Sequence, residues 1–196
     1  MTRLVLILVA GLTISITAIA QSTQPTPPAQ PTPAAPADEA VERALAAAPR
    51  NLREGATVIK WKPDQTYDTL RKGSNRLVCY DQSGEPSEQP YSVQCTSIGN
   101  LDRVAQNKKF ELQTDRAARQ KEIDAAEANG TRVKPEFGSV FYTIQGPDKE
   151  KARLHMTIAV PGATAASLGL PDNNKQGGAW IMNAGTSTAH IMVPGS

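Results

Sequence analysis

Cys79 and Cys95 are the only cysteines of this 196-residue chain, and a bond between them would constrain the centre of the fold. They lie in the segment RLVCYDQSGEPSEQPYSVQCTS, where two short runs of alternating apolar and polar residues flank a turn region rich in Gly, Pro, Ser and Glu. This pattern predicts a hairpin or a long loop closed by a disulfide. A redox-active dithiol is the alternative, but the C-x-x-C spacing that favours it is absent.

The state of these cysteines depends on the compartment, and the amino end of the chain predicts export. Arg3 gives the start a positive charge, residues 4–19 are uncharged and mostly apolar, and Ala18-Ile19-Ala20 has small residues where signal peptidase reads them. We expect a signal peptide over residues 1–20, cleaved between Ala20 and Gln21, and a secreted or periplasmic protein without a membrane span after cleavage. An uncleaved anchor is the alternative, because the apolar run is near the lower limit of about 17 residues for a spanning helix. In an oxidising compartment a single cysteine pair normally forms a disulfide.

A proline-rich segment follows the expected cleavage site. Residues 21–37, QSTQPTPPAQPTPAAPA, contain six prolines, no charge and no large apolar side chain. Such a segment cannot bury enough surface to offset the entropy of ordering, so we expect a disordered linker. The remaining residues, 38–196, have the length of a single globular domain.

The charge of the chain is close to balanced once the signal peptide is removed. Loss of Arg3 reduces the 21 basic residues to 20, against 19 acidic residues. A dedicated nucleic-acid-binding protein would carry a strong basic excess, so we expect no nucleic acid as a partner.

The periodicity of apolar residues predicts the elements of the domain. A short helix is expected over residues 38–49, a strand over 55–61 and a long helix from Asn100 to Asn129-Gly130, whose evenly mixed charges indicate a solvent-exposed face without a ligand. Two hairpins are expected near the C-terminus, joining residues 138–145 to 152–160 and residues 179–183 to 189–195. The predicted fold class is α+β, with an antiparallel sheet of about five strands and one long helix packed on it.

The last segment, AGTSTAHIMVPGS, holds the candidates for catalysis. Ser187 and His190 would be a nucleophile and its base, with His155 in support. The second glycine of G-x-S-x-G is missing, however, and residues three apart along a strand are about 10 Å apart, so these residues cannot be assumed to be partners. A metal site needs three or four converging ligands, and only two histidines are present. We therefore expect no metal and no cofactor, and keep hydrolysis or a metal-assisted reaction at His190 as an alternative.

A basic segment, RKGSNR, precedes the first cysteine. Gly73 and Asn75 suit a turn with positive φ angles. The segment is either a solvated turn or a loop that binds an anion through Arg71, Lys72 and Arg76.

Several short segments resemble a group of uncharacterised secreted bacterial proteins. They are ALAAAP with EGATVIKW near the start of the domain, TLRKGSNRLVC, and GAWIMNAGTSTAHIMVPG near the end. The shared pattern is R-K-G-x-N followed by a cysteine, and a terminal His-Ile-Met-Val/Ile-Pro. The resemblance implies an exported, disulfide-bridged protein and transfers no catalytic residue.

Three hypotheses about function follow. The first is an exported, non-catalytic binding or structural module, whose partner is a cell-envelope polymer or a protein. The second is an enzyme that uses His190, with His155 or Ser187. The third is an envelope-associated anion-binding protein that uses Arg71, Lys72 and Arg76.

Overall fold

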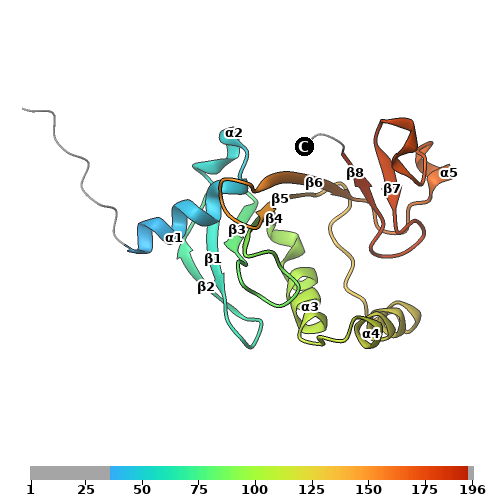
Figure 1. The fold of residues 1–196 in the computed structure, drawn as a ribbon, viewed down its shortest axis with the longest axis horizontal. Coiled ribbons are helices and arrows are strands. Elements are labelled where there is room, and N and C mark those ends of the chain that lie inside the picture. The colour runs from blue at the N-terminus through green and yellow to red at the C-terminus, as the bar shows by residue number, and fades with distance from the viewer. Residues whose placement is uncertain (1–35, 194–196) are drawn as a thin grey trace, which may run out of the picture. The chain divides into compact units, whose positions relative to one another are not determined.

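The structure, a computed structural model, describes residues 36–193 (Figure 1). The expected signal peptide, the cleavage site between Ala20 and Gln21, and nearly all of the expected linker lie outside the described residues. Helix α1 begins at Pro36, two residues before the expected start of the domain.

The strands form one mixed sheet in the order β2-β1-β3-β4-β5-β6-β8-β7, with β2 at one end and β7 at the other (Figure 1). All neighbouring strands are antiparallel except β1 and β3, which are parallel. The eight strands are β1 (Thr57–Trp61), β2 (Tyr67–Arg71), β3 (Leu77–Asp81), β4 (Tyr91–Ser97), β5 (Val140–Gly146), β6 (Arg153–Ala159), β7 (Trp180–Met182) and β8 (His190–Met192).

The α+β class is confirmed, but the prediction of about five purely antiparallel strands is wrong. Strand β2 was not expected, because four of its five residues are exposed and its sequence, YDTLR, shows no apolar alternation. It pairs back on β1 and occupies the edge of the sheet. The chain then crosses to the other side of β1, which makes β3 parallel to β1.

One face of the sheet packs against the N-terminal helices. These are α1 (Pro36–Ala44), the single 3-10 turn η1 (Leu45–Ala47) and α2 (Arg50–Arg53). Leu45 is almost completely buried against alternate residues of three strands, Val58, Cys79, Val93 and Cys95. We call this side of the sheet the disulfide face. Pro49, expected to end a helix, stands between η1 and α2 and begins the second of them as its N-cap residue.

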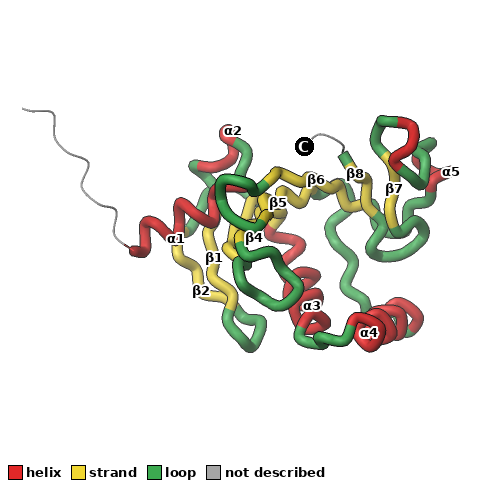
Figure 2. The backbone as a smooth tube through the Cα atoms, viewed as in Figure 1, coloured by secondary structure: helices red, strands yellow, loops and turns green. Residues whose placement is uncertain are grey.

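The opposite face packs against α3 (Leu101–Glu111), and we call it the α3 face. Leu101 and Val104 contact Ile59, Val78 and Tyr80, which alternate with the residues of the disulfide face. A helix packed on the sheet was expected, but it is not a single long one. A second helix, α4 (Arg116–Ala128), follows a break in the chain, which Figure 2 shows as a loop between two helices.

The break has a local cause. The Asp115 carboxylate accepts a hydrogen bond from the Ala118 backbone N–H at 2.7 Å, which makes Asp115 the N-cap of a new helix. The predicted end of the helical region is correct, since α4 stops at Ala128 and Gly130 has a φ of 74°. Asn100 does not cap α3 with its side chain, which instead bonds to Thr96, Ser139 and the backbone of Glu136.

The two C-terminal strand pairs were predicted correctly. Strand β5 pairs with β6 and β7 pairs with β8, both antiparallel. The sequence did not indicate that β8 lies between β6 and β7. This order places the last strand of the described chain next to β6, and so brings His190 to the α3 face.

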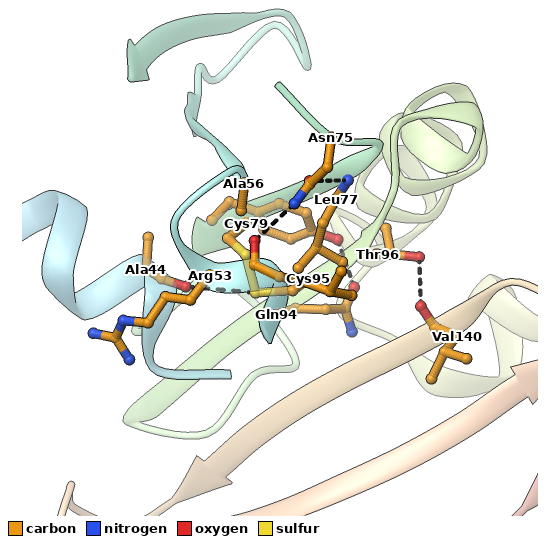
Figure 3. The surroundings of a disulfide bond; sticks show 12 residues. Ala44, Arg53, Ala56, Asn75, Leu77, Cys79, Gln94, Cys95, Thr96 and Val140 are labelled. Carbon is orange, nitrogen blue, oxygen red and sulfur yellow. Dashed lines mark hydrogen bonds between the residues drawn. A yellow bond between two sulfur atoms is a disulfide. The ribbon is translucent and has the colours of Figure 1, made fainter. Parts of the chain in front are cut away.

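The predicted disulfide is present. Cys79 and Cys95 lie directly opposite each other in the antiparallel β3–β4 pair, with their Cα atoms 4.1 Å apart. Both residues are fully buried, and the Cys95 Sγ atom lies 3.8 Å from the carbonyl oxygen of Ala44 (Figure 3). The bond therefore joins two neighbouring inner strands of the sheet, β3 and β4, beneath the N-terminal helices.

Replacing Cys79 and Cys95 together by alanine should lower the free energy of unfolding by about 3 kcal/mol, because the bond restricts the unfolded chain over a separation of 16 residues. Urea denaturation measures the loss. A reductant should destabilise the wild-type protein and leave the double variant unaffected. An unchanged wild-type midpoint in reductant would contradict the prediction.

Candidate functional site

The basic segment before the first cysteine is a tightly bonded crossing between β2 and β3. The Arg71 guanidinium donates hydrogen bonds to the carbonyl oxygens of Arg53 and Ala56, each at 2.8 Å. The Asn75 side chain donates to the carbonyl of Leu52 at 2.7 Å. These contacts hold the crossing against the chain that leads into β1.

The cations of this segment differ in what they contact. Arg71 bonds to backbone carbonyls, as described above, and Arg76 forms an ion pair with Glu136 at 2.9 Å. Lys72 is exposed. The contacts of Arg71 and Arg76 give both side chains a structural role in the connection between β2 and β3. Anion binding through Arg71, Lys72 and Arg76 stays a prediction.

Gly73 allows the closest approach in this crossing. A Cβ atom at this position would lie 2.3 Å from the carbonyl oxygen of Gly55 and 2.5 Å from backbone atoms of Ala56 and Thr57. These neighbours are backbone atoms, so they cannot rotate away. A residue other than glycine requires the two chain segments to separate.

The substitution Gly73→Ala should therefore lower the free energy of unfolding by about 2 kcal/mol, the usual range for overpacking. Thermal or urea unfolding measures the effect. Gly178→Ala is the matched control, because a Cβ atom there meets nothing within 4 Å. Equal stability of the two variants would show that the crossing is looser than described.

Ser187 is buried, and its side chain bonds to Glu127 and Arg103. Its hydroxyl donates to the carboxylate of Glu127 and accepts from Arg103 at 3.0 Å, and its backbone N–H also donates to Glu127. Only 6% of the residue is exposed. Over residues 36–193, no hydrogen bond joins Ser187 to His155 or His190, so the predicted nucleophile and base are not in contact.

The two histidines lie on neighbouring strands, but out of register. His190 on β8 pairs with Ala159 on β6, whereas His155 lies four residues earlier on β6. Four residues along a strand span about 13 Å. Both side chains belong to the α3 face. The cross-strand pairs Tyr80–Gln94, Gln94–Thr143 and Thr143–His155 place His155 on the same side as Tyr80. His190 pairs with Ala159, which lies on the same side of β6 as His155. The described part of the chain contains no cluster of three His, Cys, Asp or Glu residues that could hold a metal.

Both histidines line a pocket of about 230 Å³ on the α3 face. Strands β4, β5, β6 and β8 form its floor, while α3 and the segment around Pro135 form its walls. The apolar part of the lining consists of Pro135, Phe141, Ala159 and Ala189. The polar part consists of Gln94, Arg103, Asn107, Thr143, His155, Thr157, Thr188 and His190.

Arg103 is the polar residue that organises this pocket, although only 3% of it is exposed. Its guanidinium donates to the Val133 carbonyl, the Ser187 and Thr188 hydroxyls, and the Asn107 side-chain oxygen. It thereby ties α3 to the turn before β8 and to the chain that leads into β5. The sequence predicted a solvated charged face here, and the burial of Arg103 contradicts that prediction.

A second buried arginine, Arg132, supports the first. It donates to the side-chain oxygens of Gln106 and Asn107 at 2.7 and 2.6 Å, and its guanidinium lies 5.0 Å from the ring centre of Phe110. Burial, and then repulsion from Arg132, lower the pKa of Arg103 to about 10, while the Glu127 carboxylate acts in the opposite direction. Arg103 therefore remains a cation at neutral pH.

Lys108 also contradicts the prediction that the charged residues of this helix are exposed to solvent. It is 6% exposed and forms an ion pair with Glu85 of the β3–β4 connection. Its ammonium group also lies 5.6 Å from the ring centre of Trp61 and 5.9 Å from that of Tyr80. Lys108 thereby links the β3–β4 connection to α3.

Sequence reasoning identified two lining residues of the pocket, His155 and His190, and missed the rest. Arg103 and Asn107 lie four positions apart in a helix that carries both acidic and basic residues, and nothing in this pattern distinguishes them from exposed residues such as Arg116. Their partners are far away in sequence, 84 residues in the case of Arg103 and Ser187. No local signal could have found this pair.

The fold and the pocket define the class of protein, an α+β domain with a disulfide-bridged half and a polar pocket built around a buried arginine. Comparisons with protein-family models, curated proteins and solved structures found no match to this chain. Within residues 36–193, every helix is too short or too polar to cross a bilayer.

Replacing Arg103 by methionine should lower the free energy of unfolding by about 3 kcal/mol, because the acceptors around it lose their buried donor. Urea denaturation measures this loss. Arg116→Met is the matched control, since Arg116 is exposed at the start of α4. Similar stabilities of the two variants would mean that the guanidinium contributes no more than a surface charge.

Proposed function

We propose that this protein is an exported, non-catalytic binding module, and that its ligand site is the pocket on the α3 face. The ligand is a small polar molecule, or a polar group of a cell-envelope polymer. The observation that carries this proposal is the concentration of polar side chains from five elements in one pocket of about 230 Å³.

The positions of these side chains support binding on a rigid site. Gln94, Thr143 and His155 lie in one row across three paired strands, so the sheet ladder sets their spacing. Gln94 also bonds to Thr143 at 2.8 Å and accepts from Tyr80 beneath α3. A site whose residues are held by strands and by second contacts binds without a large ordering cost.

The bonding of Ser187 supports a role without catalysis. Its hydroxyl is shared between Glu127 and Arg103, so it is committed to the structure. A nucleophile needs a base within hydrogen-bond reach, and neither histidine has such a contact with it in the described chain.

Catalysis by His190 is the second candidate, and one observation favours it. The His190 Nδ1 atom lies 2.8 Å from the Thr188 carbonyl oxygen, which can only accept, so Nδ1 carries the proton and Nε2 is left as a base. This candidate predicts turnover of a substrate that is lost in His190→Ala. The binding module predicts that no bound compound is altered.

Export is supported by two features. The disulfide between Cys79 and Cys95 is typical of oxidising compartments. The start of the sequence has the charge, apolar run and small residues of a signal peptide. Mass spectrometry of the secreted or periplasmic fraction would show a chain that starts at Gln21 if Ala20 is the last residue removed.

The binding proposal is tested by filling the pocket. Thr157→Phe adds a ring to the pocket floor from β6, and Thr69→Phe adds the same ring to the exposed edge strand β2. Two-dimensional amide NMR spectra of the purified protein are recorded with a set of small sugars, amino acids, amides and organic acids. We expect bound compounds to shift the amide signals of Thr188, Ala189 and His190 in the wild type and in Thr69→Phe.

In Thr157→Phe the same compounds should bind at least about tenfold more weakly, because the added ring occupies their space. Binding that is unchanged in Thr157→Phe, or an absence of any shift at these amides, would contradict the pocket as the ligand site. Chemical change of a bound compound would favour the His190 candidate.

A further inference from the structure

The hydrogen bonds of Arg103 determine which groups around the pocket are donors. A guanidinium has five N–H donors and no acceptor, so each of its partners must accept. Four of these bonds are formed, from Nε to Asn107, from Nη1 to Val133 and Ser187, and from Nη2 to Thr188. Among the described residues, the second N–H of Nη2 has no acceptor, and it lies next to Thr188 at the pocket wall.

The same constraint orients the partners of Arg103. The Asn107 side-chain oxygen accepts from both Arg103 and Arg132, at 3.2 and 2.6 Å, so its amide NH₂ is directed elsewhere. The Thr188 oxygen accepts from Arg103 at 2.9 Å, which leaves its O–H to donate. Within the described residues, neither this NH₂ nor this O–H is bonded to an acceptor. Both residues line the pocket.

The lining of the pocket offers these donors no carboxylate within the described residues. None of its lining residues within the described chain is Asp or Glu. The nearest carboxylate of the network, Glu127, is already occupied by the hydroxyl and the backbone N–H of Ser187. The pocket therefore presents unsatisfied donors and lacks a negative group of its own.

The charges around Arg103 also favour a negatively charged ligand. Arg132 repels Arg103 and Glu127 attracts it, so the two neighbouring charges act in opposite directions. Within residues 36–193, Arg103 forms no ion pair of its own. A buried cation is strongly favoured by an anion that can reach its free donor. Only one such charge is open to the pocket wall, which suits a ligand with a single negative charge.

We propose that the pocket binds a carboxylate group, held by the free Nη2 hydrogen of Arg103, the Thr188 hydroxyl and the Asn107 amide. This inference rests on the proposed function and adds the chemical class of the ligand. A carboxylate has two oxygens with about four acceptor sites and no donor, which matches the three groups that face it. Two or more charges, as on phosphate, would leave excess negative charge in a buried site.

The test uses acetate, which presents a carboxylate and little else, and acetamide, which has a similar size but no charge. Each is titrated against the wild-type protein, and the amide signals of Thr188, Ala189 and His190 are followed by NMR at constant ionic strength. We expect saturable shifts with acetate and an affinity for acetamide that is at least about tenfold lower, because an NH₂ group cannot satisfy the donors. Inorganic phosphate should also bind more weakly than acetate.

Asn107→Asp is the decisive variant. It keeps an oxygen that accepts from Arg103 and Arg132, so the fold is retained, but it replaces the donor NH₂ by a negatively charged oxygen. We expect thermal stability to be kept and acetate binding to be lost. Asn174→Asp is the matched control, because it adds the same charge at an exposed residue of the 3-10 turn Asn174–Gln176 and should leave acetate binding unchanged.

The outcomes separate this inference from the proposed function. If sugars or amides shift the pocket amides and acetate does not, the pocket binds a ligand but the carboxylate assignment is wrong. Equal affinities for acetate and acetamide, tighter binding of phosphate, or acetate binding that persists in Asn107→Asp would also overturn it. If no compound moves these signals, both proposals fail.

Discussion

The buried guanidinium of Arg103 must find acceptors for its N–H groups, and the C-terminal half of the structure is arranged around that requirement. It obtains them from the chain before β5, from the turn before β8 and from its own helix. The turn residues Ser187 and Thr188 can accept only because β8 lies beside β6, which brings the turn under α3. The pocket is a consequence of this arrangement, since the same contacts form its wall.

The N-terminal half is stabilised in a different way. Its core is apolar, with the disulfide between β3 and β4 covered by Leu45 and its neighbours. The sheet connects the halves, because β4 and β5 pair with each other and carry apolar residues on the disulfide face and polar residues such as Gln94 and Thr143 on the other. An apolar core on one face of the sheet thus lies opposite a polar pocket on the other face. The free energy gained by burying apolar surface offsets the desolvation cost of burying the arginines.

Elements with a clear local pattern could be predicted from the sequence. The β5–β6 and β7–β8 pairs have alternating or β-rich runs joined by turn residues, and both were expected. Strand β2 was not, since an edge strand exposed on both faces needs no apolar alternation. The division of the expected long helix depends on one capping residue, Asp115, within a polar run where an aspartate is unremarkable.

The sequence by itself determined the cysteine pair, the α+β class and the strands that face a core, because these follow from composition and from the spacing of apolar residues along the chain. Only the tertiary structure decided which charged residues are buried and what they contact. Arg103 and Ser187 are 84 residues apart, and the bond between them depends on the strand order that places β8 beside β6. Such long-range pairing leaves no periodic pattern, so the pocket and its donors became visible only in the folded chain.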